Sequence, residues 1–437
     1  MRTIGQANVA IDEAAGIFRV SRNAFVSDQV FEQEQSRIFA RCWLYLGHEA
    51  ELPEAGSFRT RRVAGREIIF NRDMSGKVNA FFDSCPHRGA KVCMEKSGTA
   101  RQFHCIYHGW NFEADGTLKR QPHHSGYSET FNADGALNLM RLPRLESYRG
   151  LWFVNFDKNA ISLEDYLGNA REYIDCFVDQ NEQVEIIAGA QEYGIAANWK
   201  LLCENSVDGY HANNLHATYF DYARNIAPKL PDGPAPARGG LYGVARALDN
   251  GHMVGEFSGP WGRPAGKWFP SWGEAAKPEI AARRADLVAR VGEEKADRIA
   301  NLNRNLVIFP NLVLIDGTGM VIRVVQPSAP GFMEVCTWAV ADARDSDWLR
   351  DIRMQNFLSF LGPGGLATPD DVEALERCQQ GYSNRREAGW NDISRGNMED
   401  NDQPLDHEFH IRAYWKHWAE CLDRTDMVAE AADKAAA

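Results

Sequence analysis

The sequence has 437 residues, 44% of them hydrophobic and 25% charged, which is typical of a globular protein with two or three domains. Its formal net charge of −12 provides no sustained basic face and argues against a nucleic-acid-binding protein. No apolar run approaches the roughly 18 residues of a membrane-spanning helix, and the N-terminus lacks the apolar stretch of a signal peptide. The sequence therefore predicts a cytoplasmic protein.

Residues 1–40 are predicted to form a helical segment that packs on the C-terminal domain, with Ser27 or Asp28 as the helix N-cap. Residues 41–157 consist of short strand-like runs separated by turn residues. This pattern predicts a small antiparallel β domain. The clearest runs are Glu67–Phe70, Val78–Phe82, Gln102–Cys105 and Leu151–Phe156.

The β domain carries two Cys/His pairs, Cys85-Pro-His87 and Cys105-Ile-Tyr-His108. Zinc accepts two Cys and two His, but its usual spacing groups the cysteines together and the histidines together. Here each loop supplies one thiolate and one imidazole. That mixed pattern suits a Rieske [2Fe–2S] cluster, in which one iron takes both thiolates and the other takes both imidazoles. The sequence contains nine cysteines, and an odd number argues against a disulfide framework.

Residues 158–437 mix helix and strand patterns. Helices are predicted at 163–177, 278–303 and 368–380, strands within 183–194 and at 306–309, 312–315, 321–325 and 333–340, and a long loop at 228–240. Polar residues cluster in Asn198–His216, after an apolar helical start. Their burial is costly unless they are hydrogen-bonded or bind a metal.

Two histidines of this stretch, His211 and His216, suit the two-His-one-carboxylate triad of non-haem iron oxygenases. Five residues correspond to roughly 500° of rotation on an ideal helix, so the two histidines would not share a face. We therefore expect the helix to break between them, at Asn213-Asn214. From spacing alone, Asp208 is a candidate for the third ligand.

Together these motifs resemble the large (α) subunit of the Rieske non-haem iron aromatic-ring-hydroxylating oxygenases. The matching segments are Cys85-Pro-His87-Arg-Gly, Cys105-Ile-Tyr-His108-Gly-Trp, Asn198-Trp-Lys, Glu204-Asn205, Asp208-Gly-Tyr-His211 and His216, and the resemblance extends from Trp43 to Pro369. It implies an α+β fold, with a Rieske domain at 41–157 and a START/Bet v1-like catalytic domain, built on an antiparallel sheet with helices, at 158–437.

The resemblance also implies roles for single residues. Cys85, His87, Cys105 and His108 would hold the [2Fe–2S] cluster, and His211, His216 and Asp371 the mononuclear Fe(II). Asp208 would instead receive electrons from His108 of a neighbouring subunit, and Asn205 would lie near the open face of the iron. The segment Thr368-Pro-Asp370-Asp371 is also an ordinary helix start, with a Thr cap and acids in the first turn. Asp371 is favoured over Asp370.

The implied activity is hydroxylation of an aromatic ring, to a cis-dihydrodiol or a monohydroxylated product, with O₂ and electrons from a ferredoxin or ferredoxin reductase. The electron path requires a trimer, of α₃β₃ type with a small β subunit or of α₃ type. The segment Gly365–Glu373 resembles enzymes of aromatic carboxylic acids, because hydrocarbon enzymes tend to place an aromatic residue at Ala367. The alternative substrate is a polycyclic or alkyl-aromatic hydrocarbon. Arg224, Arg238 and Lys267 are nearby cations, and none is assigned to a substrate carboxylate.

Two other classes are open to the sequence. A Rieske electron carrier without oxygenase activity would have no use for His211, His216 and Asp371. A zinc-stabilised binding protein would be colourless, whereas a Rieske protein is red-brown.

Overall fold

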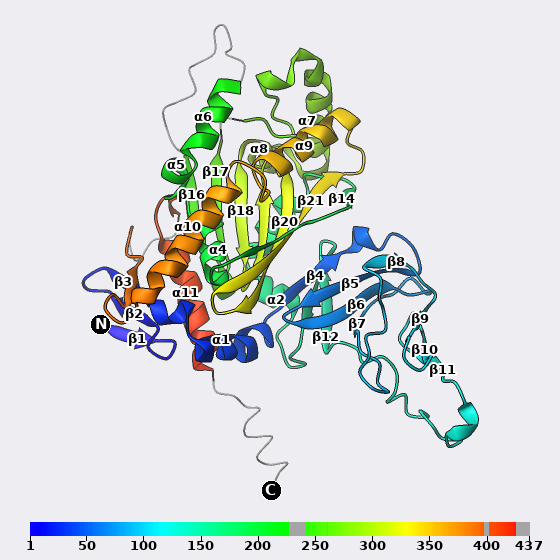
Figure 1. The fold of residues 1–437 in the computed structure, drawn as a ribbon. Coiled ribbons are helices and arrows are strands. Elements are labelled where there is room, and N and C mark those ends of the chain that lie inside the picture. Colours follow the sequence, from blue (N-terminus) through cyan, green and yellow to red (C-terminus); the bar gives the residue numbers. More distant parts are fainter. Residues whose placement is uncertain (227–241, 260, 397–401, 425–437) are drawn as a thin grey trace. The chain divides into compact units, whose positions relative to one another are not determined.

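The computed structural model describes residues 1–226, 242–259, 261–396 and 402–424. The chain divides into two compact units (Figure 1). The small unit comprises Phe39–Leu163, and the large unit comprises Met1–Ile38 together with Glu164–Ala437. Within the described ranges, no helix combines the length and apolar character needed to cross a membrane.

The small unit is built from three antiparallel sheets, with strand orders β7-β6-β5-β8, β12-β13-β4 and β11-β10-β9. The strands are β4 (Leu44–His48), β5 (Ser57–Val63), β6 (Arg66–Arg72), β7 (Val78–Phe82), β8 (Ser97–Thr99), β9 (Gln102–His104), β10 (Asn111–Glu113), β11 (Leu118–Arg120), β12 (Arg144–Tyr148) and β13 (Leu151–Asn155). The predicted strands of the β domain are therefore confirmed, with ends shifted by one or two residues.

Aromatic and aliphatic side chains of these strands form one core around the two cysteines of the Cys/His pairs. Its members include Phe58, Ile69, Phe81, Phe103, Phe112, Cys85 and Cys105. The turn between β6 and β7 is closed by Asp73, whose Oδ1 accepts hydrogen bonds from the backbone of Ser75 and Lys77 at 2.8 and 3.1 Å. Such side-chain-to-backbone bonds stabilise tight turns, so the β6–β7 hairpin holds the loop that follows β7.

The large unit begins with strands, and the helical prediction for residues 1–40 is wrong for its first half. β1 (Arg2–Ile4), β2 (Val9–Asp12) and β3 (Ile17–Ser21) form a sheet that β22 (Trp390–Asp392) completes. β1–β2 and β2–β3 are local hairpins, whereas the second partner of β3 comes from the far end of the sequence, so local patterning could not reveal that pairing. The helix predicted after Ser27 is confirmed as α1 (Asp28–Glu34), and Oγ of Ser27 accepts a hydrogen bond from the backbone of Val30 at 3.3 Å.

The main sheet of the large unit is antiparallel, with the strand order β14-β21-β20-β19-β18-β17-β16-β23, and β15 also pairs with β21. Its strands are β14 (Val184–Ile186), β15 (Gln191–Ile195), β16 (Tyr242–Ala247), β17 (Met253–Ser258), β18 (Asn303–Ile308), β19 (Leu312–Asp316), β20 (Met320–Ala329), β21 (Phe332–Asp342) and β23 (Gln403–Pro404). The predicted strands of residues 306–340 coincide with β18–β21, except that Phe309 follows the end of β18. β19, at the centre of the sheet, is buried along its whole length, whereas the first half of β21 alternates between buried and more exposed residues.

Helices α4, α9 and α11 pack on this sheet (Figure 1). The described helices after α1 are α2 (Leu163–Leu167), α3 (Ala170–Val178), α4 (Trp199–Asn205), α5 (Ala212–Leu215), α6 (Ala217–Ile226), α7 (Lys277–Val291), α8 (Glu293–Asn301), α9 (Asp347–Ser359), α10 (Thr368–Gly381) and α11 (Phe409–Asp423).

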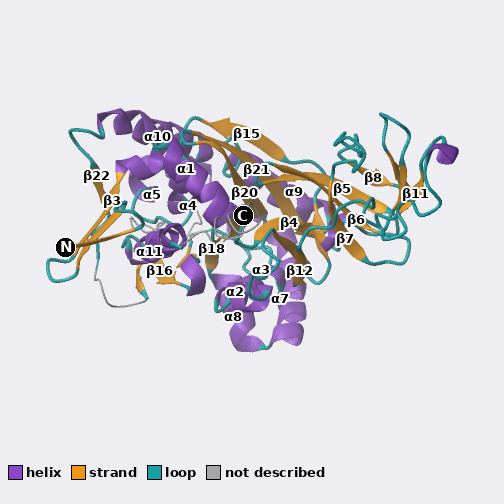
Figure 2. Ribbon diagram, turned by 90° about the horizontal axis from the view of Figure 1, so that it is seen from below, coloured by secondary structure: helices purple, strands orange, loops and turns teal. Residues whose placement is uncertain are grey.

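Two predicted helices are each split in the structure. The segment 163–177 forms α2 and α3, and 278–303 forms α7 and α8, which lie side by side in Figure 2. Gly292 separates α7 from α8 with φ of +83°, a conformation that glycine adopts without steric cost. The predicted loop at 228–240 lies outside the described residues.

Candidate metal centres

The two Cys/His loops of the small unit share one backbone conformation. In the first, the N–H of Cys85 donates to the carbonyl of Ala90 and the N–H of Gly89 donates to the carbonyl of Cys85, both at 2.8 Å. In the second, Cys105 donates to Trp110 at 2.8 Å and Gly109 donates to Cys105 at 3.0 Å. Gly89 and Gly109 have φ of +73° and +68°. The two loops therefore hold their cysteines and glycines in equivalent positions, and each adds one imidazole, two residues after Cys85 and three residues after Cys105.

The four side chains of these loops fit a [2Fe–2S] cluster. The rings of His87 and His108 lie 4.4 Å apart between centroids, and Nδ1 of His87 is buried without a hydrogen-bond partner. Burial raises the pKa of the Cys85 thiol, and the neighbouring Cys105 raises it further. Two buried cysteines beside an unpartnered imidazole nitrogen suit a site in which a metal would coordinate the sulfurs as thiolates.

The second centre is organised by α4 in the large unit. Lys200 is buried at the start of this helix, and its Nζ pairs with Oε1 of Glu34 at 2.5 Å. The indole N–H groups of Trp199 and Trp418 donate to the same carboxylate at 2.9 and 2.8 Å. A buried ion pair needs such additional hydrogen bonds to offset its desolvation. The arrangement ties α4 to α1 and α11, so its C-terminal residue, Asn205, has a defined position.

The chain after α4 does not break where the sequence predicted. Asn213 and Asn214 lie inside the short helix α5, and the non-helical residue is His216 itself, with φ of −96° and ψ of 26°. His211 precedes α5 and His216 follows it, with ring centroids 5.2 Å apart. The predicted break at Asn213-Asn214 is therefore wrong, because a tight four-residue helix followed by one irregular residue already brings the two rings together.

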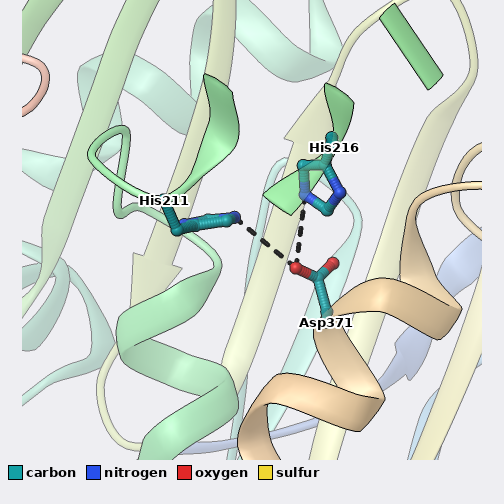
Figure 3. Close-up of side chains that lie close together, drawn as sticks. All are labelled: His211, His216 and Asp371. Atoms are coloured by element: carbon teal, nitrogen blue, oxygen red, sulfur yellow. Dashed lines mark ion pairs between the residues drawn. The ribbon is translucent and has the colours of Figure 1, made fainter. Parts of the chain in front are cut away.

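Asp371, in the first turn of α10, lies between the two imidazoles (Figure 3). Its Oδ1 is 3.5 Å from Nε2 of His211 and 3.3 Å from Nε2 of His216. One donor atom from each of the three residues lies within 4.8 Å of the others. Donors about 2.1 Å from one ion, at right angles, are about 3 Å apart, so modest contraction around an ion would complete the geometry. Two imidazoles and one carboxylate are the donor set of non-haem iron.

The neighbouring Asp370 points to a different atom. Its Oδ2 lies 3.5 Å from Nδ1 of His216, on the side of the ring away from Asp371. Burial lowers the pKa of His216, but Asp371 and Asp370 together raise it above its usual value. The expected Thr cap is not present, since Ala367 is the N-cap and the Thr368 hydroxyl instead donates to the carbonyl of Phe360 at 3.3 Å.

Asp208 lies beside the triad and contacts only one of its histidines. Its Oδ2 is 3.0 Å from Nδ1 of His211, and its Oδ1 accepts from the backbone of Tyr210 at 2.7 Å. Burial raises the pKa of Asp208, yet the bond and charge of His211 outweigh it, so the pKa lies below its usual range. A carboxylate only accepts hydrogen bonds, so Nδ1 of His211 carries a proton, and Nε2 is the nitrogen that would serve as the ligand of a bound metal.

The amide of Asn205 reaches the same point. Its Nδ2 lies 3.1 Å from Oδ1 of Asp371 and 3.3 Å from Nε2 of His211. The structure thus brings together every residue that the sequence proposed for this centre.

The triad and Asn205 also line a cavity of about 160 Å³ in the large unit. Its walls are largely apolar and aromatic, and they include Tyr219, Phe220, Phe257, Trp261, Ile315, Phe360 and Leu361. A pocket with apolar walls and a few placed polar groups is typical of a small-molecule site. The volume and the aromatic walls suit a small, flat apolar ring.

Arg323 on β20 lies in the cavity wall and was not proposed from the sequence. It is the one lysine or arginine among the described residues of that wall. Its signal was present as a single charge within the apolar run Val321–Val325. Of the cations considered from the sequence, Lys267 donates to the carbonyl of Gly259 at 3.1 Å. Arg238 and the side chain of Arg224 lie outside the described part of the chain.

Comparison with protein families finds two matches that follow each other along the chain. Residues 42–145 match the family model described as the Rieske [2Fe–2S] domain, and residues 163–424 match the one described as the ring hydroxylating alpha subunit (catalytic domain).

Similar proteins cover most of this chain. The alpha subunit of toluate 1,2-dioxygenase from Pseudomonas putida is 33% identical over 395 residues, covering 88% of this chain and 83% of that protein. The large subunit of anthranilate 1,2-dioxygenase from Acinetobacter baylyi is 31% identical, with coverages of 87% and 81%. Among solved structures, naphthalene 1,2-dioxygenase from Rhodococcus sp. bound to indole has a TM-score of 0.79 at 26% identity, covering 92% of this chain and 94% of that chain.

Proposed function

The chain belongs to the ring-hydroxylating alpha subunits with a Rieske [2Fe–2S] domain, and from that premise we propose that it hydroxylates the ring of an aromatic carboxylic acid. The observation that carries the proposal is the placement of His211, His216 and Asp371 on the wall of an aromatic-lined cavity. Relatives named toluate, 2-halobenzoate and anthranilate dioxygenase support an aromatic acid as the substrate. The chain is thus an oxygenase subunit that uses O₂ and electrons.

We propose that Cys85, His87, Cys105 and His108 hold the [2Fe–2S] cluster. We also propose that His211, His216 and Asp371 hold the Fe(II). When bound, the cluster stores one electron at a time and the ferrous ion activates O₂. The equivalent Cys/His loops and the convergence of the three donor atoms support these assignments.

The chain's own side chains prepare this chemistry. Asp208 accepts a hydrogen bond from Nδ1–H of His211 and so keeps Nε2 of that ring available as a ligand. Asn205 places an amide N–H beside Asp371, where it can orient the carboxylate. The aromatic walls of the cavity exclude water and hold the substrate ring against the three ligands.

For the domains, we propose a cluster domain at 41–157 and a catalytic domain at 158–437 on which the N-terminal segment packs. The backbone N–H of Gly5 donates to Asp423 at 2.8 Å, which supports the packing of that segment on α11.

For the partners, we propose a ferredoxin or ferredoxin reductase as the electron donor, a small β subunit in an α₃β₃ assembly, with α₃ as the alternative, and a cytoplasmic location. The side chain of Asp208 is 24% exposed, which supports its proposed role as receiver of electrons from His108 of a neighbouring subunit.

The test of the function is a single turnover of the purified, iron-loaded and reduced oxygenase with benzoate under ¹⁸O₂. Benzoate, O₂, two electrons and two protons balance to a cis-dihydrodiol, so both oxygen atoms of the label should appear in the product. Incorporation of one labelled atom into a phenol would indicate monohydroxylation. Products from naphthalene but not from benzoate would favour the hydrocarbon alternative, and no labelled product from either would contradict the proposal.

The cluster ligands predict a spectroscopic result. Replacing Cys105 by serine should remove the red-brown visible absorption, because the thiolate that the iron requires is lost. The matched control is Cys93→Ser. Cys93 belongs to the same core but is no proposed ligand, and burial raises its pKa to about 11. The control should keep the wild-type visible spectrum. A coloured Cys105→Ser variant would contradict the assignment of Cys105.

A further inference from the structure

We propose that Arg323 is the residue that binds the carboxylate of the aromatic substrate. This inference rests on the proposed function and adds the residue that would determine the preference for acids. Arg323 lines the cavity that contains the metal ligands. It lies on β20, which is labelled in Figure 1 and pairs with β19 and β21 in the main sheet.

The guanidinium of Arg323 is buried but has no acidic partner. Only 6% of the residue is exposed, and no carboxylate among the described residues lies within ion-pairing distance. Its hydrogen bonds go to neutral oxygens, from Nε to the hydroxyl of Thr337 at 3.4 Å and from Nη2 to the carbonyl of Leu361 at 3.2 Å. A buried charge is costly unless it is paired, so this position favours an anion.

The other charged group of the cavity wall away from the metal ligands is already neutralised. Oδ1 of Asp316 accepts from Nη2 of Arg263, and its Oδ2 accepts from Nη1 of Arg304 at 2.9 Å. All three side chains are 1% exposed. Because two arginines surround Asp316, it leaves no negative charge to repel an anionic substrate or to pair with Arg323.

The polar neighbours of Asp316 are also committed to the protein. Oδ1 of Asn303 accepts from Arg263 and Trp261 at 2.8 and 3.0 Å, and its Nδ2 donates to the carbonyl of Phe257 at 3.1 Å. The hydroxyl of Thr318 donates to the carbonyl of Gly262 at 2.8 Å. Arg323 is therefore the group of this wall whose charge still lacks a partner.

The position of Arg323 relative to the metal ligands suits a substrate held at both ends. Leu361, whose carbonyl accepts its hydrogen bond, follows Phe360. The ring of Phe360 lies 6.3 Å from that of His216, between centroids. The guanidinium is thus hydrogen-bonded to the residue that follows Phe360, and both Arg323 and His216 line the cavity. A carboxylate on Arg323 would leave the aromatic ring of the acid between the apolar walls and the metal centre.

Arginine has the right chemistry for this role. A guanidinium has five N–H donors in a planar fork, and the two hydrogen bonds to Thr337 and Leu361 use two of them. The remaining donors can bind the oxygens of a carboxylate, in the charge-assisted geometry that arginine and carboxylates prefer. The alternative is a purely structural arginine that holds the Leu361 segment in place.

The test is equilibrium binding of two probes of the same shape, benzoate and benzamide, to the iron-loaded oxygenase. Arg323→Gln should raise the Kd of benzoate roughly 10- to 100-fold, which is the range for losing charge-assisted hydrogen bonds. It should change the Kd of benzamide by no more than about threefold. The Kd of benzoate for Arg323→Lys should lie between those of the wild type and Arg323→Gln, since lysine keeps the positive charge but lacks the planar fork of N–H donors.

The matched control is Arg353→Gln. Arg353 is also buried, at 3% exposed, but it pairs with Asp345 at 2.8 Å and does not line the cavity. This variant should keep the wild-type Kd for both probes. A structural role for Arg323 predicts instead that Arg323→Gln weakens benzoate and benzamide equally and lowers the melting temperature.

The outcomes separate this inference from the proposed function. Equal weakening of both probes, or wild-type binding of benzoate no tighter than that of benzamide, would overturn the role of Arg323. An enzyme that hydroxylates toluene but does not bind benzoate would keep the family's chemistry and refute the carboxylate site. The assignment is supported if Arg323→Gln loses its preference for benzoate over benzamide while Arg353→Gln keeps it.

Discussion

Replacing Asp371 by alanine is expected to remove the mononuclear iron and to stop turnover while the [2Fe–2S] cluster stays intact. Oδ1 of Asp371 is the oxygen that faces Nε2 of both His211 and His216. Without it the site has two neutral ligands and no ligand whose negative charge offsets the positive charge of Fe(II). We expect the iron content attributable to this centre to fall below about a tenth of wild type, since even supporting residues cost 10- to 100-fold in metal affinity.

Metal analysis together with the visible spectrum checks this prediction, because the two centres can be counted separately. The matched control is Asp370→Asn, the adjacent residue of the same helix turn. Asp370 lies 3.5 Å from Nδ1 of His216, on the far side of the ring, and asparagine keeps an acceptor there. The control should retain the mononuclear iron. Iron loss in Asp370→Asn with retention in Asp371→Ala would exchange the roles of the two aspartates.

Replacing Asp208 by alanine is expected to leave both metal centres loaded at excess Fe(II) and to reduce turnover by about 10- to 100-fold. Asp208 contacts His211 only through Nδ1, so it orients the ligand and does not compete for the position of the ion. Its loss frees the ring to rotate and to change tautomer. It also removes the carboxylate that we propose receives electrons from a neighbouring subunit.

The iron content of Asp208→Ala, measured after loading with excess Fe(II), distinguishes an orienting residue from a ligand. Asp208→Asn is the informative second variant, since its amide oxygen can still accept a hydrogen bond from Nδ1–H of His211 but carries no charge. It should bind iron as wild type and recover part of the turnover. If Asp208→Ala lost the iron as completely as Asp371→Ala, Asp208 would be a ligand and the present assignment would be wrong.

The local motifs of the sequence were sufficient to predict the two Cys/His loops. Cys85 and His87 are two residues apart, and Cys105 and His108 are three apart, so each pair is confined to one turn. Glycines at 89 and 109 follow at the same offset from each cysteine. Because all the constraints of such a loop lie within a few residues, its conformation can be predicted without the rest of the chain.

The same locality explains which elements were predicted correctly. The apolar runs of β18–β21 and the Ser27 cap of α1 are short-range patterns, and the structure confirms them. The strands of residues 2–21 form two local hairpins and were missed because they are short and the first turn uses Gln6 and Ala7, non-glycine residues with positive φ; only the pairing of β3 with β22 is long-range. The break at Asn213-Asn214 was wrong because the segment between the two histidines, Ala212–Leu215, stays helical, and the backbone leaves the helical region only at His216.

The metal triad and the cavity were decided by tertiary structure. The sequence by itself determined which residue types were present and, through the family motifs, suggested Asp371 as the third ligand. Only the packing of α10 against α4 sets its carboxylate 3.3–3.5 Å from the two imidazoles. Likewise, the sequence shows Arg323 only as a charge inside an apolar strand. The structure shows that the nearby Asp316 is paired with Arg263 and Arg304, so Asp316 is not the partner of Arg323. Such long-range contacts depend on the summed packing of the whole large unit, and no short window of sequence contains that information.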